Sequence, residues 1–207
     1  MKLQLALDVD KKNGLSLCNK TKKYIDIIEI GTPLVKEEGL GVIKEFKKFR
    51  KPIVADLKTM DTGFLEADMA FKAGADISSV CGTADDATIK GAVKVARERG
   101  KEILVDLIAV KNIVKRTKEI LKLKPDYICV HTGIDMQNKE SPLINLKRVS
   151  KIVKGKVKVV VAGGINIKNI DKIKKLNPYI IVIGGAITKA KNPVSVAKKL
   201  KEVVENG

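Results

Sequence analysis

The chain of 207 residues is 44% hydrophobic, which is enough to bury one large core and excludes a disordered protein. Aromatic residues make up only 3% and tryptophan is absent, so the core must consist of Ile, Val, Leu and Ala, as in parallel strands buried on both faces. The net charge of +17 favours an anionic small-molecule partner over nucleic acid, because arginines and aromatic residues that read or stack on bases are few.

Eight short apolar runs alternate with longer charged segments of helical periodicity, the pattern of repeated βα units. We predict strands at 3–8, 24–30, 53–57, 76–80, 102–107, 127–131, 158–162 and 179–183. Eight such units close into a single (β/α)8 TIM barrel, which we expect to occupy residues 1–207 as one domain. An open doubly wound sheet is the alternative, although no GxGxxG motif follows the first strand.

Polar residues stand where the predicted strands end. These residues are Asp8, Glu29, Asp56 followed by Lys58, Asp106, and His131, which is the single histidine. Alternation along a strand places each of Asp8, Glu29, Asp56 and His131 in line with inward-facing residues. Because the active sites of TIM barrels lie at the C-terminal ends of the strands, we expect these side chains to share one site.

Glu29 and Asp56 end neighbouring strands, which lie about 4.8 Å apart in a parallel sheet. Two carboxylates that close together repel, so one takes up a proton unless a cation lies between them. Lys58 is one candidate cation and a divalent metal is another. Mg²⁺ suits a pair of carboxylates and fills its other positions with water and substrate oxygens, so this pair predicts a substrate that chelates.

Glycine pairs follow the last two predicted strands, in the segments VAGGIN and VIGGAIT. Loops in these positions commonly bind phosphate in this fold, because their backbone N–H groups meet an anion at a helix N-terminus. The alternative is that the glycines only form tight turns.

Three cysteines, Cys18, Cys81 and Cys129, are far apart in the sequence and odd in number. This usage indicates free thiols in a reducing compartment. The first ten residues contain too short an apolar stretch for a signal peptide, and no run approaches the roughly 20 apolar residues of a membrane span. We therefore expect a cytoplasmic protein with no membrane partner.

DLKTMD, residues 56–61, fits the DxKxxD signature of the orotidine 5′-phosphate decarboxylase superfamily. The ordered set ADLKTMDTG, AFKAGADISSV, GTADDATIKGAV, HTGIDMQ, VAGGI and IGGAIT resembles more narrowly the 3-hexulose-6-phosphate synthase family. This resemblance runs from Leu3 to about Pro193. It implies a Mg²⁺-dependent aldolase that joins formaldehyde to D-ribulose 5-phosphate, reversibly, through a metal-stabilised enediolate.

The resemblance also implies roles for individual residues. Glu29 and Asp56 would hold the metal; Asp8, Lys58 and His131 would line the sugar; and Gly163, Gly164, Gly185 and Ala186 would offer backbone N–H groups to the phosphate. Asp61 would reach into the site of a neighbouring subunit, so a homodimer is expected. Our hypothesis assigns the proton transfers to His131 and keeps Lys58 protonated between Asp56 and Asp61.

Three other functions are weighed against the aldolase. Orotidine 5′-phosphate decarboxylase carries a lysine at the end of the second strand, where this chain has Glu29. The 3-keto-L-gulonate 6-phosphate decarboxylase shares the metal carboxylates but places an arginine three residues after the histidine, where this chain has Ile134. A non-catalytic binding barrel would have lost the polar strand ends, and this chain retains them.

Overall fold

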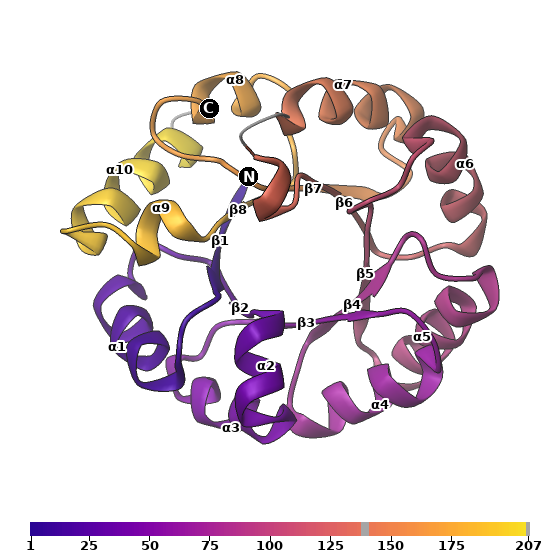
Figure 1. Cartoon of the computed structure of the whole chain (residues 1–207), viewed down its shortest axis with the longest axis horizontal. Helices are drawn as coiled ribbons and strands as arrows, with labels where there is room; N and C mark the ends of the chain where they lie inside the picture. Colours follow the sequence, from indigo (N-terminus) through magenta and orange to yellow (C-terminus); the bar gives the residue numbers. More distant parts are fainter. Residues whose placement is uncertain (138–140, 206–207) are drawn as a thin grey trace.

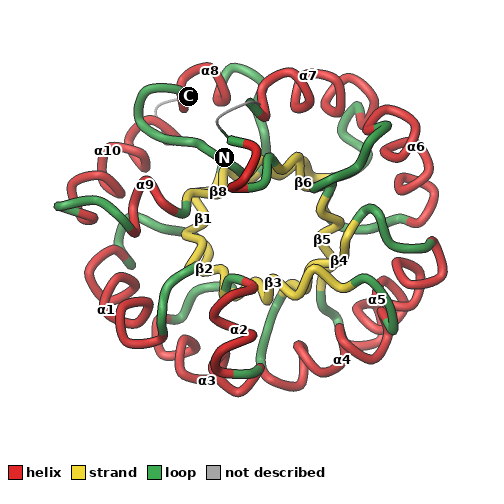
Figure 2. Tube along the Cα trace, viewed as in Figure 1, coloured by secondary structure: helices red, strands yellow, loops and turns green. Residues whose placement is uncertain are grey.

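The computed structural model describes residues 1–137 and 141–205, and its strands close into one parallel barrel in which β1 pairs with both β2 and β8. Figure 2 shows the strands as an inner ring. Their bounds are β1 Lys2–Leu7, β2 Ile27–Ile30, β3 Ile53–Thr59, β4 Ile77–Cys81, β5 Glu102–Asp106, β6 Tyr127–His131, β7 Lys158–Ala162 and β8 Ile180–Ile183. The prediction of a (β/α)8 TIM barrel is confirmed.

Helices form an outer ring around the strands (Figure 1). The α-helices are α1 Lys11–Thr21, α2 Thr32–Glu38, α3 Ile43–Phe46, α4 Gly63–Ala73, α5 Asp86–Arg99, α6 Ile113–Leu123, α7 Pro142–Val153, α8 Ile170–Lys174, α9 Gly185–Thr188 and α10 Pro193–Glu205. The described residues also form the 3-10 turns η1 Leu40–Val42, η2 Lys47–Phe49 and η3 Ile134–Met136. None of the helices in the described part of the chain is long and apolar enough to cross a bilayer.

Two apolar layers follow from the alternation of side chains along each strand. The larger layer packs the outward faces of the strands against the helices. The smaller one fills the barrel and consists of Ala6, Ile27, Val54, Ile77, Leu104, Tyr127, Cys129, Val160, Ala162, Ile180 and Val182. Aliphatic residues dominate both layers, as the shortage of aromatic residues predicts. The filled interior leaves only the ends of the barrel open to solvent and ligands.

The structure differs from the predicted strand boundaries at two places that bear on the site. β2 begins at Ile27 rather than at 24, because the Tyr24 N–H bonds to the Thr21 carbonyl in the turn that ends α1. β3 continues past 57 to Thr59, with a shift in its register to β4 between Ala55 and Thr59. Within this irregular segment Lys58 has a left-handed backbone with φ of 49°.

Candidate active site

Three carboxylates meet at the mouth of the barrel, where β1, β2 and β3 end. Glu29 is level with Ala6 on β1 and with Val54 on β3. Asp8 and Asp56 each stand one inward-facing position further along their strands, so they flank Glu29 nearer the rim. Desolvation and then the charge of Asp56 raise the pKa of Glu29 to about 8, and the same two causes raise the pKa of Asp8. The carboxylates are therefore close enough to oppose one another's ionisation.

Asp56 is the most firmly held of these carboxylates. It is buried, and it accepts hydrogen bonds from Ser79 Oγ at 2.8 Å and from Thr32 Oγ1 at 2.9 Å. Its Oδ2 atom also forms an ion pair with Lys58 Nζ. These partners come from β4, the start of α2 and β3 itself, so the carboxylate is held in one orientation before any ligand binds.

Lys58 owes its position to the irregularity in β3. Its N–H donates to Ser79 Oγ at 3.0 Å while its side chain turns back to Asp56, and its ammonium lies 3.7 Å from Asp106 Oδ2. A left-handed lysine costs on the order of 1–3 kcal/mol, and such strain gathers at functional sites. Burial disfavours the ammonium, but Asp56 and Asp106 outweigh it and hold the pKa of Lys58 above its ordinary value. Lys58 is therefore a cation throughout the neutral pH range.

His131 and Asp106 form a second pair at the ends of β6 and β5. His131 Nδ1 lies 2.8 Å from Asp106 Oδ2, and Asp106 is fully buried. Burial opposes the imidazolium, but the hydrogen bond to Asp106 and its charge raise the pKa of His131. Burial alone would raise the pKa of Asp106, but His131 and then Lys58 lower it. An ionised Asp106 accepts the Nδ1–H of His131 and leaves Nε2 free to exchange a proton.

Replacing Asp106 by asparagine is expected to lower the pKa of His131, because the charge that stabilises the imidazolium is lost while a hydrogen-bonding side chain remains. His131 is the chain's single histidine, so NMR titration of its ring protons reports this pKa directly. Glu119→Gln, which removes a carboxylate on α6, serves as the control and should leave the titration unchanged. An unshifted titration in the Asp106 variant would show that the pair does not control the imidazole.

Glycines after β7 and β8 lie in the same mouth. Gly163 and Gly164 have φ of 100° and 66°, and a Cβ at Gly163 would collide with the Thr132 carbonyl. Gly185 and Ala186 begin α9, so their N–H groups have no acceptor within that helix. This geometry requires glycine at Gly163 and leaves the N–H groups of Gly185 and Ala186 without an acceptor in α9; the phosphate role of these residues stays a prediction.

A family model described as Orotidine 5'-phosphate decarboxylase / HUMPS family matches residues 1–200. The chain belongs to this family. It is 44% identical to 3-hexulose-6-phosphate synthase 3 of Staphylococcus saprophyticus, with 99% of each chain covered. A crystal structure of a 3-hexulose-6-phosphate synthase is 43% identical with a TM-score of 0.92, over 99% of this chain and 100% of that one. The same enzyme from Salmonella typhimurium is 36% identical with a TM-score of 0.96, over 100% of this chain and 99% of that one.

Asp56 and Lys58 of the DxKxxD motif lie in the carboxylate cluster at the mouth of the barrel, but Asp61 does not. Its side chain is exposed, and its Oδ1 accepts the N–H of Thr62 at 2.7 Å. The ammonium of Lys58 pairs with Asp56 and Asp106 instead, so the expectation that Asp61 holds Lys58 is not met within one chain.

Several polar residues of the site were not assigned a role from the sequence. Ser79 and Thr32 orient Asp56, and Asp106 orients His131. Gln4 is buried inside β1 and donates its side-chain N–H to Glu29, while its own carbonyl oxygen has no partner among the described residues. A buried glutamine in an otherwise apolar strand was the available signal for Gln4, since such a group needs a polar partner, and the position at a strand end was the signal for Asp106.

Proposed function

We propose that the chain is a 3-hexulose-6-phosphate synthase, an aldolase that joins formaldehyde to D-ribulose 5-phosphate. The observation that carries the proposal is the convergence of Glu29, Asp56 and Lys58 with the Asp106–His131 pair at one mouth of the barrel. The names of the relatives described above support the same activity.

A divalent cation fits the charges of this mouth. Asp8, Glu29, Asp56 and Asp106 bring four carboxyl groups to the mouth, and burial with the charge of Asp56 raises the pKa of Glu29 to about 8, a cost that a cation between the two groups would relieve. Among the described residues no group of three or more His, Cys, Asp or Glu side chains is arranged to hold a metal ion. A two-carboxylate site formed by Glu29 and Asp56 remains, which suits Mg²⁺. Bound there, Mg²⁺ would polarise the ketose carbonyl and stabilise negative charge on its oxygen.

His131 is proposed to move the proton at C1 of the ketose. Asp106 holds Nδ1, so Nε2 is the nitrogen left to accept the proton. Loss of the proton makes C1 nucleophilic, and C1 then bonds to the carbon of formaldehyde. The π bond of the formaldehyde carbonyl breaks, its electron pair goes to oxygen, and that oxygen takes up the proton that His131 received. Lys58 remains a cation, so it can donate hydrogen bonds to the sugar oxygens and stabilise negative charge on them.

The phosphate of the substrate is proposed to bind the backbone N–H groups of Gly163, Gly164, Gly185 and Ala186. A side chain that the sequence did not single out supports this assignment. Burial and the charge of Asp56 raise the pKa of Asp8, and the charges of Lys58, His131 and then Lys189, which follows α9, oppose that rise. An exposed ammonium at this rim favours a dianionic group.

The 3-keto-L-gulonate 6-phosphate decarboxylase reaction is disfavoured at one position. Where the resemblance expects an arginine for that reaction, this chain has Ile134 in η3 with 71% of its surface exposed. An apolar side chain cannot supply the proton that a decarboxylated carbanion needs.

The proposal is tested by purifying the protein, removing metal with EDTA and restoring Mg²⁺. Formaldehyde consumption with ribulose 5-phosphate should appear only after restoration. Turnover of 3-keto-L-gulonate 6-phosphate or orotidylate at a higher kcat/KM than the condensation would refute the proposal and show that the chain is a decarboxylase.

A homodimer through α4 is the second part of the proposal. Four exposed apolar side chains lie on α4 and the loop before it, namely Met60, Phe64, Leu65 and Met69. Leu65 and Met69 are four residues apart and so share one helix face. Asp61 is exposed and adjoins this patch in the sequence, as expected for the side chain that the resemblance assigns to a neighbouring subunit's site. Clustered exposed apolar residues mark protein interfaces.

Leu65→Asp is expected to weaken the dimer by at least about 2 kcal/mol, roughly 30-fold in Kd, because it places a charge in the centre of the patch. Light scattering across a dilution series measures the change. Ile144→Asp on α7, where the isoleucine is 65% exposed against 56% for Leu65, is the matched control and should leave the mass unchanged. A wild-type chain that is monomeric at micromolar concentration would refute the dimer.

Cys18, Cys81 and Cys129 are all free thiols, and all are buried. This state supports the proposal that the protein works in the reducing cytoplasm.

A further inference from the structure

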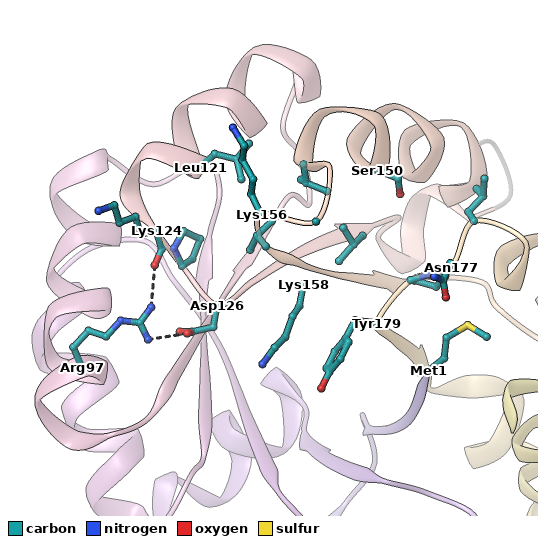
Figure 3. A pocket seen from close by; sticks show the side chains of 17 residues that line it. Met1, Arg97, Leu121, Lys124, Asp126, Ser150, Lys156, Lys158, Asn177 and Tyr179 are labelled. Atoms are coloured by element: carbon teal, nitrogen blue, oxygen red, sulfur yellow. Dashed lines mark hydrogen bonds and ion pairs between the residues drawn. The ribbon is translucent and has the colours of Figure 1, made fainter. Parts of the chain in front are cut away.

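A second concave region lies at the end of the barrel opposite to the candidate active site. A cavity of about 930 Å³ is bordered by Lys158 at the start of β7, by Tyr179 just before β8 and by the turn at Lys124. Figure 3 shows these side chains. A second cavity of about 560 Å³ adjoins it between α6 and α7 and shares Leu121 and Lys156 with it. We call the two cavities together the basic groove.

Lysines are the commonest charged residues in the lining of the basic groove. Six of them are exposed and form no ion pair among the described residues: Lys118, Lys122, Lys124, Lys151, Lys154 and Lys156. The other cations of the lining are already paired. Arg97 bonds to Asp126 and to the Lys124 carbonyl, as Figure 3 shows, and Lys158 bonds to Glu102. The groove therefore carries a large uncompensated positive charge in one place.

Helix dipoles offset only part of this positive charge. The C-termini of α6 and α7 reach the groove, and each contributes about half a negative charge. Six ammonium groups exceed that by several charges, and they repel one another unless an anion joins them.

The backbone shows that two of the lysines stand where glycine is the unstrained choice. Lys124 and Lys154 cap α6 and α7 in the left-handed conformation, with φ of 57° and 44°. In the same chain α4 and α5 end at glycines in that conformation, Gly74 and Gly100. A left-handed backbone costs more at lysine than at glycine, so both positions carry a lysine side chain at the expense of backbone strain.

We infer that the basic groove binds a polyphosphate chain, either an inorganic polyphosphate or the phosphate tail of a nucleotide. Lysine ammoniums act as point charges and suit a flexible chain of phosphates, which requires no planar bidentate partner. The larger cavity has the size of a small-molecule site. Base-reading groups are lacking for a nucleic acid, since Arg97 is engaged and Tyr179 already carries the ammoniums of Lys2 and Lys158 near its ring.

The groove lies far from the active site. β7 separates the two ends by four residue steps, or roughly 13 Å of strand. Occupancy of one site should therefore leave the other open, which distinguishes this inference from the proposed function.

Calorimetric titration of sodium triphosphate into the full chain at low salt tests the inference, with and without saturating ribulose 5-phosphate. The groove variant is Lys122→Gln, Lys154→Gln and Lys156→Gln together. The control variant, Lys20→Gln, Lys44→Gln and Lys90→Gln, removes the same charge from exposed lysines without ion pairs elsewhere in the described chain. Because all six positions are exposed, both variants should melt within a few degrees of the wild type.

Triphosphate is expected to bind the wild type and the control variant equally, to bind the groove variant at least tenfold more weakly, and to remain bound when ribulose 5-phosphate is added. ATP distinguishes the source of the phosphates. Tighter binding of ATP than of triphosphate identifies a nucleotide site, and equal binding of ATP and triphosphate identifies an inorganic polyphosphate site. Equal loss in the two variants, displacement by ribulose 5-phosphate, or binding of long RNA without binding of triphosphate would each overturn the inference.

Discussion

Glu29→Gln is expected to lower kcat/KM for the condensation by about 10³-fold, since a metal acting as a Lewis acid supplies several kcal/mol of transition-state stabilisation. The amide has the shape of the carboxyl group and can still hydrogen-bond to Gln4, so the barrel should fold as before. What is lost is the charge, and with it half of the two-carboxylate site that Glu29 forms with Asp56.

Activity alone would not distinguish a lost metal from a displaced substrate, so the measurement includes Mn²⁺ binding followed by electron paramagnetic resonance. The Glu29 variant should bind Mn²⁺ much more weakly than the wild type. Glu37→Gln on α2 removes an exposed carboxylate outside the mouth and serves as the charge-matched control. Full Mn²⁺ occupancy and near-normal turnover in Glu29→Gln would exclude the metal role.

The same variant has a consequence for stability in metal-free protein. The pKa of Glu29 is about 8 in the fold against an ordinary value of 4.5. Between these two values the unfolded chain has lost its proton and the folded chain keeps it, so stability falls by about 1.4 kcal/mol per pH unit as pH rises. Glutamine does not titrate. In EDTA, the Tm of the variant should therefore exceed that of the wild type at pH 8, and the difference should shrink toward pH 5.

His131→Ala is expected to lower kcat by about 10²- to 10⁴-fold, the usual contribution of a positioned acid–base group. The ring lies at the open end of β6, and its Nδ1 is bound to Asp106, so the variant removes the one group whose free nitrogen can exchange protons near neutral pH. The KM for ribulose 5-phosphate should change less than kcat, because the proposed phosphate contacts are backbone N–H groups that this substitution leaves in place.

Stopped-flow measurement of C1 proton exchange with deuterated solvent, without formaldehyde, isolates this step. The alanine variant should lose exchange and condensation together, and added imidazole should restore part of both. Exchange at the wild-type rate in the alanine variant would move the base elsewhere, with Asp8 the next carboxylate at the same rim.

Much of the fold and of the site could be predicted from the sequence because the relevant signals are local. Short Ile- and Val-rich runs between helical segments predict parallel strands, and a polar residue after such a run must lie at the strand's C-terminal end. This reasoning places Asp8, Glu29, Asp56, Asp106 and His131 and the glycines after β7 and β8 at one end of the barrel. It also predicted the repulsion between Glu29 and Asp56, which depends only on their being on neighbouring strands.

Only the tertiary structure decided which residues distant in the sequence contact one another. Asp106 could have faced any charge in the mouth, and the closed barrel places it against His131 and Lys58. The irregular turn at Lys58 arises from its fit to Ser79 on β4, which no strand pattern encodes. The six lysines of the basic groove each resemble solvated surface residues in the sequence. They become one charged groove because α6 and α7 pack side by side, since electrostatic energy depends on distance in space rather than along the chain.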